Sequence, residues 1–339
     1  MAALQTLAAF SAAALLALAG TSTVRAHGTA DVGPPDAAAF LLGWTFEPIV
    51  AIPLLVAALA WIAAVRKVNA AHPANPVPRV RTVAFLGGLF AIAVALLSGI
   101  ERYDTVLFSV HMVQHIILTL VAPPLIALGA PITLLLRLAR PETRRRWILP
   151  ALHSRVVRAL SFPVVAWVLF AGVMWATHFS AVFDRALEDQ FVHDLEHAAY
   201  LGAGLLFWWP AIGLDPTPWR MSHPVRALYV VLQMPQNTFL AVAILSAPAP
   251  LYEHYATLTR LWGPTPLADQ QAAAGIMWLV GDLLFLAAIL GLVAAWMRHE
   301  ERSTGIADRR ADARRAEIGA REARLAERLA EEQVSGERR

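Results

Sequence analysis

The chain has 339 residues, of which 58% are hydrophobic, and its formal net charge at pH 7 is only +3. A mean hydropathy of +0.53 is far too high for an ordinary soluble domain of this length. The charged residues occur in blocks, and long uncharged stretches separate them. This pattern is typical of a polytopic helical membrane protein and excludes a water-soluble globular domain.

The first 26 residues have the features of a secretory signal peptide. Residues 7–18 form a short apolar run, and Val24-Arg25-Ala26 provides a small-residue cleavage site. No Lys or Arg precedes the apolar run, so an uncleaved first helix is the alternative. Cleavage after Ala26 would leave residues 27–45 as an N-terminal segment on the outer side.

Seven further apolar segments follow, each close to the roughly 20 residues that are needed to cross a bilayer. We expect these spans at residues 46–66, 82–100, 106–128, 156–177, 191–213, 224–247 and 271–297. The sequence therefore predicts an all-α transmembrane bundle of seven spans, within residues 46–298. A charged, helical tail, residues 299–339, is expected to follow it.

The loop charges predict the orientation of the bundle. Arg and Lys concentrate in the loops after the first, third and fifth spans, whereas the opposite loops hold only Arg102, Arg185 and Arg260. By the positive-inside rule, the N-terminus lies outside and the C-terminal tail lies in the cytoplasm. We therefore expect a multi-pass protein of the bacterial inner (plasma) membrane.

Several spans contain polar residues or prolines. Pro123-Pro124 is expected to break the third span, leaving residues 125–137 as a bent continuation. In the sixth span, Gln236 lies beside Pro235 at a depth where exposed amides must face protein or a polar cavity. Asp282 lies in the middle of the seventh span, where a carboxylate either packs against such amides or relays protons.

Histidines near the outer face carry the functional prediction. His111 and His115 lie four residues apart in the third span, His193 and His197 lie four apart in the fifth, and His178 ends the fourth. Residues four apart share one face of a helix, and imidazole at this depth is costly without a partner. The pairs therefore indicate a metal site; the alternative is that each pair joins two helices by hydrogen bonds.

The type of ligand favours copper. Imidazole suits copper, zinc and iron, and the thioethers of Met112, Met174 or Met277 shift the preference toward Cu(I). The chain has no cysteine, which excludes a Cys-x-x-Cys shuttle. The predicted metal ligands are His111, His115, His178, His193, His197, Met174 and Met277. The predicted supporting or proton-relay residues are Asp194, Asp282 and Gln236.

Several motifs in order resemble those of the CtaG family, the multi-span assembly factors of haem–copper cytochrome c oxidases. They are His111-Met112-Val113-Gln114-His115, Ala122-Pro123-Pro124-Leu125, Gly129-Ala130-Pro131, His193-Asp194-Leu195-Glu196-His197, Leu206-Phe207-Trp208-Trp209-Pro210, Tyr252 with Tyr255, Asp269-Gln270-Gln271 and Gly275-Ile276-Met277-Trp278. The resemblance covers about residues 40–298. It implies a role in making active cytochrome c oxidase, by handling copper, with oxidase subunits as partners.

Other classes of protein remain open. A b-type haem redox protein, which we expect less, would ligate iron with one histidine from each of two helices, such as His115 and His197. A membrane metal transporter would use the midspan amides and Asp282 as part of a polar path. The motif His193-Asp194-x-x-His197 has Asp where the zinc-protease motif needs Glu, which disfavours a protease.

Nothing in the sequence supplies a catalytic set, so we do not expect an enzyme. The basic loops are explained by topology and by anionic membrane lipid, so no nucleic acid partner is expected.

Overall fold

The computed structural model describes residues 33–336 except 37, 39, 41 and 42. The regular structure of these residues is helical, without a strand. The predicted signal peptide and much of the segment 27–45 lie outside the described residues and stay predictions. The chain forms two units, one that ends at Ile289 and one that begins at Leu290.

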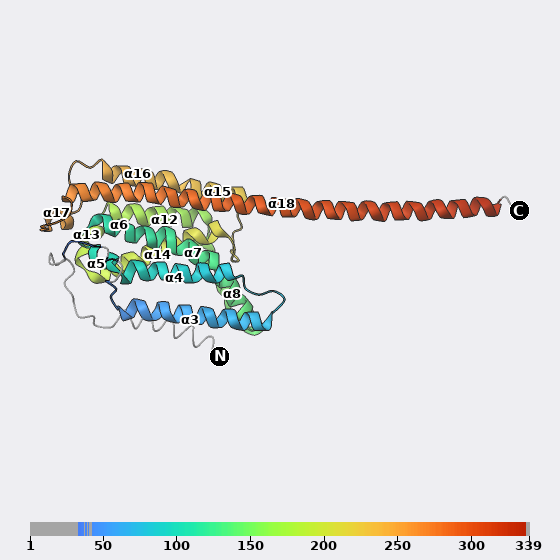
Figure 1. The fold of residues 1–339 in the computed structure, drawn as a ribbon, viewed down its shortest axis with the longest axis horizontal. Coiled ribbons are helices and arrows are strands. Elements are labelled where there is room, and N and C mark those ends of the chain that lie inside the picture. Colours follow the sequence, from blue (N-terminus) through green and yellow to red (C-terminus); the bar gives the residue numbers. More distant parts are fainter. Residues whose placement is uncertain (1–32, 37, 39, 41–42, 337–339) are drawn as a thin grey trace. The chain divides into compact units, whose positions relative to one another are not determined.

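The first unit is a bundle of long helices joined by short ones (Figure 1). Its first elements are α3 (Pro48–Ala71), α4 (Arg79–Leu97), α5 (Gly99–Tyr103), α6 (Phe108–Ile116), the π-helical turn η1 (Ile117–Val121), α7 (Ala122–Gly129), α8 (Pro131–Leu138), α9 (Pro141–Thr143), the second π-helical turn η2 (Arg144–Ile148), α10 (Leu149–Leu152) and α11 (Arg155–Leu160). Then follow α12 (Pro163–His178), α13 (Val182–Glu188), α14 (Gln190–Ile212), α15 (His223–Val231), α16 (Gln233–Leu245), α17 (Glu253–Thr257) and the start of α18 (Pro266–Gly336). Helix α14 packs against α7 and α12, and α4 packs against α7 and α3.

The seven predicted spans lie mostly in helices, although the fourth covers α11 and α12 and the sixth covers α15 and α16. Five helices are long and apolar enough to cross a membrane, and a sixth qualifies if α12 and α13, which are bent by 70° relative to each other, form one span. Helix α14 is not among these candidates, because polar side chains such as His193, Glu196 and His197 lower the hydropathy of its first turns. The structure therefore confirms a helical membrane protein with five or six candidate spans.

Large apolar side chains cover much of the outside of these helices. Only 6% of the apolar window of α3 is buried, and Leu55, Phe90 and Leu283 are among the exposed side chains. A contiguous exposed apolar surface of this kind is expected where lipid, rather than water, surrounds the helices.

The expected break at Pro123-Pro124 is wrong. Both prolines lie in the first turn of α7, directly after η1, and the helical run that begins at Phe108 continues past them to Gly129. Because Pro123 has no N–H, the carbonyl of Thr119 loses its usual helical partner. The indole Nε1 of Trp208 in α14 donates to that carbonyl at 3.0 Å, so a neighbouring helix satisfies the freed group.

The change of direction lies instead at Ala130, between α7 and α8. Ala130 has a φ of 57°, in the left-handed region. Buried Asp215 stabilises this corner, since its carboxylate accepts hydrogen bonds from the backbone N–H groups of Ile132 (3.1 Å) and Thr133 (2.6 Å). These groups belong to the first turn of α8, where N–H groups have no partner within the helix. The local sequence of α7 and α8 could not reveal this corner, because the carboxylate that stabilises it is distant in the chain.

At one end of the bundle lie α5, α13 and α17, together with the start of α6 (Figure 1). Asp269 of α18 accepts hydrogen bonds from the backbone N–H of Phe108 at 2.7 Å and from the hydroxyl of Ser109 at 2.6 Å. Asp269 therefore caps the helix that carries His111 and His115. This contact gives a structural role to one of the motifs found in the sequence.

The second unit is helical through Gly336, in agreement with the predicted helical tail. Most of its described side chains from residue 297 onward are exposed. An ion pair joins Arg315 to Asp312 at 3.5 Å, one turn apart on the same helix.

Candidate metal-binding site

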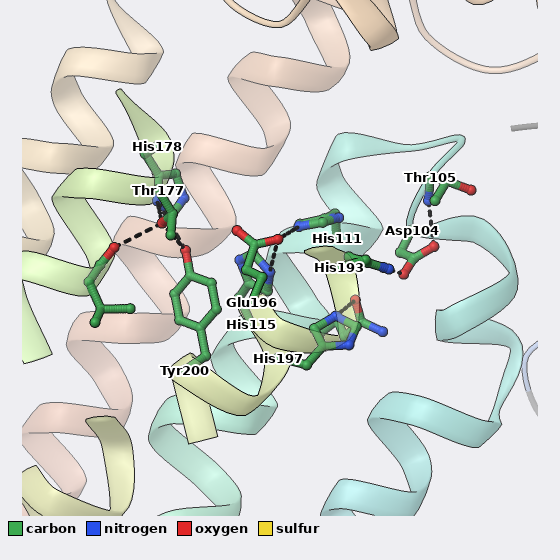
Figure 2. Close-up of polar contacts among 12 residues, drawn as sticks. Asp104, Thr105, His111, His115, Thr177, His178, His193, Glu196, His197 and Tyr200 are labelled. Atoms are coloured by element: carbon green, nitrogen blue, oxygen red, sulfur yellow. Dashed lines mark hydrogen bonds and ion pairs between the residues drawn. The ribbon is translucent and has the colours of Figure 1, made fainter. Parts of the chain in front are cut away.

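The five predicted histidines converge at the end of the bundle where α5 and α13 lie (Figure 2). Helix α6 supplies His111 and His115, α12 ends at His178, and α14 supplies His193 and His197. All five are buried, with at most 5% of each side chain exposed. The ring centroids lie 4.1 Å apart in the α6 pair and 4.2 Å apart in the α14 pair. Across the helices, the His111 and His193 rings lie 5.5 Å apart, and those of His115 and His178 lie 6.2 Å apart.

A carboxylate that the sequence reasoning missed lies among them. The Oε2 atom of Glu196 is 4.0 Å from the Nε2 atom of His111 and 4.0 Å from that of His115 (Figure 2). Within the described residues, the ring nitrogens of His111 and His115 and both oxygens of Glu196 have no hydrogen-bond partner. A buried polar group without a partner costs about 1–3 kcal/mol. A cation bound among these atoms would satisfy them together.

A second carboxylate, Asp104, lies next to His193. The two side chains approach within 3.6 Å, between Oδ2 and Nε2. Asp104, His193 and His197 can each offer one ligand atom, and these atoms all lie within 4.8 Å of one another. The same holds for His111, His193 and Glu196, so His193 belongs to both groups. Each group is a pair of imidazoles with one carboxylate, a donor set that suits zinc, copper or iron.

Burial affects the charge of Asp104, which lies outside the membrane-spanning helices. It is fully buried, and burial raises the pKa of its carboxyl to about 8. Without a cation, the group is therefore mainly protonated at neutral pH, and a bound metal ion would compete with that proton.

Hydrogen bonds assign the ligating atoms of two histidines. The Nε2 atom of Gln114 donates to Glu101 at 2.6 Å and to the carbonyl of Ala95 at 3.0 Å, so the Gln114 oxygen faces His197. The Nε2–H of His197 donates to that oxygen at 3.1 Å, which leaves Nδ1 as the basic nitrogen. In His178, the Nδ1–H donates to the carbonyl of Met174 at 2.7 Å, which leaves Nε2 as the nitrogen that can bind a metal. Such hydrogen bonds orient metal-binding imidazoles in known sites.

Tyr200 of α14 extends this group. Its ring centroid lies 4.1 Å from that of His115, and its hydroxyl contacts Thr177 and lies 3.3 Å from Nδ1 of His178 (Figure 2). Tyr200 therefore connects α14 to the end of α12 and fixes the position of the His115 ring.

The predicted supporting residues do not join this cluster. Asp194 is exposed and accepts a hydrogen bond from Gln190 at 2.8 Å on its own helix, so its supporting role stays a prediction. Asp282 accepts from Asn237 at 3.1 Å and from Thr238 at 2.8 Å, which corresponds to the packing alternative. The remaining three predicted residues, Met174, Met277 and Gln236, line a separate cavity beside His115.

Helical periodicity could have identified Glu196. Residues three and four apart share a helix face, so Glu196 and His197 lie on the same side of α14 as His193. Asp194, one residue after His193, points about 100° away from it around the helix axis. The burial agrees, because His193 is buried and Asp194 is exposed. Asp104 had no comparable signal, because it lies between two helices.

The fold and this site define a helical membrane protein with a buried histidine–carboxylate cluster at one end of its bundle. The family model described as cytochrome c oxidase caa3 assembly factor (Caa3_CtaG) matches residues 59–299, more than two thirds of the chain. The chain belongs to this family, which confirms the resemblance found in the sequence motifs.

Similar proteins occur in mycobacteria. Uncharacterized proteins of Mycobacterium bovis and Mycobacterium tuberculosis are each 32% identical to the chain over 286 residues, and one of Mycobacterium leprae is 30% identical over the same length. Each match covers 82% of this chain and 43% of the relative, so the chain spans less than half the length of these relatives. No solved structure matches the chain.

Proposed function

We propose that this member of the cytochrome c oxidase assembly factor family binds copper at the histidine–carboxylate cluster and holds it for insertion into an oxidase subunit. The observation that carries the proposal is the position of Glu196 between His111 and His115, with the polar atoms of all three unpaired by hydrogen bonds. Copper is cargo in this proposal, and the oxidase subunit that receives it is the partner.

The distances support a metal-binding role. Ligand atoms about 2.0–2.1 Å from a tetrahedral ion stand roughly 3.3 Å from one another. The 4.0 Å distances from Glu196 to His111 and His115 therefore need only small side-chain rotations to reach that spacing. Imidazole and carboxylate together are ligands that divalent copper accepts.

The proposed topology has seven spans, with α14 as the span that apolar composition does not identify. Its 23 residues are long enough to cross a bilayer, and the polar side chains of His193, Glu196 and His197 in its first turns are buried within the bundle. The basic loops suggest that the cluster lies at the outer face of the bacterial inner membrane, with the tail in the cytoplasm. Copper would then be received from the outer compartment.

The geometry favours copper binding over the two alternatives. The ring of His115 lies 4.1 Å from both the His111 ring and the Tyr200 ring, which leaves little room for a porphyrin against it. Asp282, which a transport path would use, is held by Asn237 and Thr238. The proposed role is binding rather than catalysis.

Copper loading of the purified full chain in detergent tests this proposal. The protein is titrated with copper, its absorption spectrum is recorded, and it is compared with a variant in which His111, His193 and Glu196 are changed to Ala. His72→Ala is the matched control, because His72 is exposed and lies in a different part of the bundle. We expect the triple variant to bind one copper equivalent fewer than the wild type, and His72→Ala to bind as much copper as the wild type.

Other outcomes of that titration exclude the proposal. A Soret band in the purified protein would favour a haem protein. Equal copper binding by the wild type, the triple variant and His72→Ala would place copper elsewhere. If neither copper nor haem binds, the assembly role must depend on protein contacts alone.

A further inference from the structure

A second group of metal-binding atoms lies beside His115. Three methionines, Met112 on α6, Met174 on α12 and Met277 on α18, line one cavity together with His115. The chain has only seven methionines, and these three come from separate helices that the fold brings together. The accessible interior is about 20 Å³, which is room for about one water molecule or one ion.

Part of the cavity lining is polar but uncharged. Helix α16 contributes the amides of Gln233, Gln236 and Asn237. The Oε1 atom of Gln233 is buried and has no hydrogen-bond partner among the residues described. Asn237 donates to the carbonyl of Met277 at 3.0 Å, which holds that residue in place. Two lining residues, Gln233 and His115, thus carry buried polar atoms that have no hydrogen-bond partner among the described residues.

Ligand type and charge distinguish this cavity from the histidine–carboxylate cluster. Thioether sulfur is a soft ligand that selects Cu(I), whereas imidazole with carboxylate accepts harder, divalent ions. All the side chains that line the cavity are uncharged when His115 is neutral. Since transfer of an ion out of water costs more for a higher charge, an uncharged site favours a monovalent ion over a divalent one.

We propose that this cavity is a separate Cu(I) site with Met112, Met174, Met277 and His115 as its ligands. His115 lies at both sites, because it also faces Glu196 at 4.0 Å. The chain therefore has two adjacent binding sites of different softness, and His115 belongs to both. This inference rests on the proposed function for its biological purpose.

The alternative role of the three methionines is packing. Met112 and Met277 belong to a buried apolar cluster with Phe108 and Leu240, and Met174 packs against its edge. Leucine has nearly the same volume as methionine and lacks the sulfur, so Met→Leu changes remove the ligand with a modest effect on packing. A packing role alone would leave metal binding unchanged in such variants.

The test compares wild-type protein with the variant M112L/M174L/M277L, and Met234→Leu is the matched control. Met234 is half-buried on α16 and does not line the cavity. Each protein, full-length in detergent, is titrated anaerobically with Cu(I) against a chromophoric Cu(I) chelator, and separately with Zn(II). X-ray absorption at the copper edge then reports whether sulfur is bound to Cu(I).

We expect sulfur ligands on Cu(I) in the wild type and in Met234→Leu. In the triple variant, one Cu(I) equivalent should bind at least about tenfold more weakly, while Zn(II) binding stays unchanged. Only nitrogen and oxygen ligands on wild-type Cu(I), or unchanged Cu(I) affinity in a folded triple variant, would overturn the inference. The spectrum of the wild type decides the matter even if the triple variant fails to fold.

A further variant, Glu196→Gln, separates this inference from the proposed function. It should weaken Zn(II) binding and leave the sulfur-bound Cu(I) in place. If Glu196→Gln has no effect on either metal while the methionine variant loses Cu(I), the proposed cluster fails and the thioether site stands. If the reverse holds, the cluster stands and the thioether site fails.

Discussion

The Oε2 atom of Glu196 on α14 lies 4.0 Å from the Nε2 atom of His111 on α6. These helices are distant in the chain, so their relative position depends on contacts elsewhere in the bundle. The Trp208–Thr119 hydrogen bond joins α14 to the η1 turn that continues α6. The candidate site and the packing of the bundle thus depend on the same pair of helices.

Replacement of Glu196 by Gln should weaken the binding of divalent copper at the histidine–carboxylate cluster. The change keeps the size of the side chain but removes the negative charge between His111 and His115, and we expect a loss of at least about tenfold in affinity. Asp194→Asn is the control, because Asp194 is exposed on the same helix. A competition titration with a chelator of divalent copper measures the copper affinity of both variants. Equal affinities would show that Glu196 does not bind the metal.

Replacement of Trp208 by Phe should destabilise the bundle. The carbonyl of Thr119 would be left without a partner beside Pro123, at a cost of about 1–3 kcal/mol. Trp209→Phe is a matched control, since the indole nitrogen of Trp209 has no hydrogen-bond partner among the described residues. Thermal unfolding in detergent should show a lower midpoint for Trp208→Phe than for Trp209→Phe. Similar midpoints would contradict the proposed role of the Trp208 hydrogen bond.

Gly204 allows α14 to approach α7 closely. A Cβ atom at this position would lie 2.7 Å from Cγ of Pro123 and 3.1 Å from the carbonyl oxygen of Thr119. Gly204→Ala should therefore cost about 1–3 kcal/mol through overpacking. Gly202→Ala, on the same helix, meets open space and should be neutral or slightly stabilising. The thermal midpoints of the two variants test this difference, and a stable Gly204→Ala protein would refute it.

Replacement of Asp269 by Asn should loosen the start of α6. Both carboxylate oxygens accept hydrogen bonds, from Phe108 and Ser109, and the Asn amide would present a donor to one of them. Loss of a helix cap costs about 0.5–2 kcal/mol. Because α6 carries His111, copper affinity should fall together with stability. Gln271→Ala, an exposed change nearby, is the control; unchanged unfolding of Asp269→Asn would exclude the capping role.

The sequence predicted most of the helical segments, for local reasons. Apolar length and charge blocks depend only on neighbouring residues, so the predicted spans lie mostly in helices. The four-residue spacing of His111 and His115 likewise determines that they share a face. The family could also be identified from the order of the motifs, as the match over residues 59–299 confirms.

Only the tertiary structure decided which side chains meet. Asp194 and Glu196 are equally plausible in composition, yet the face of α14 that packs inward buries Glu196 alone. Met174 and Met277 line a cavity apart from the carboxylates, and the break at Ala130 depends on distant Asp215. These outcomes depend on how helices pack, and contacts between residues far apart in the chain leave little trace in local periodicity.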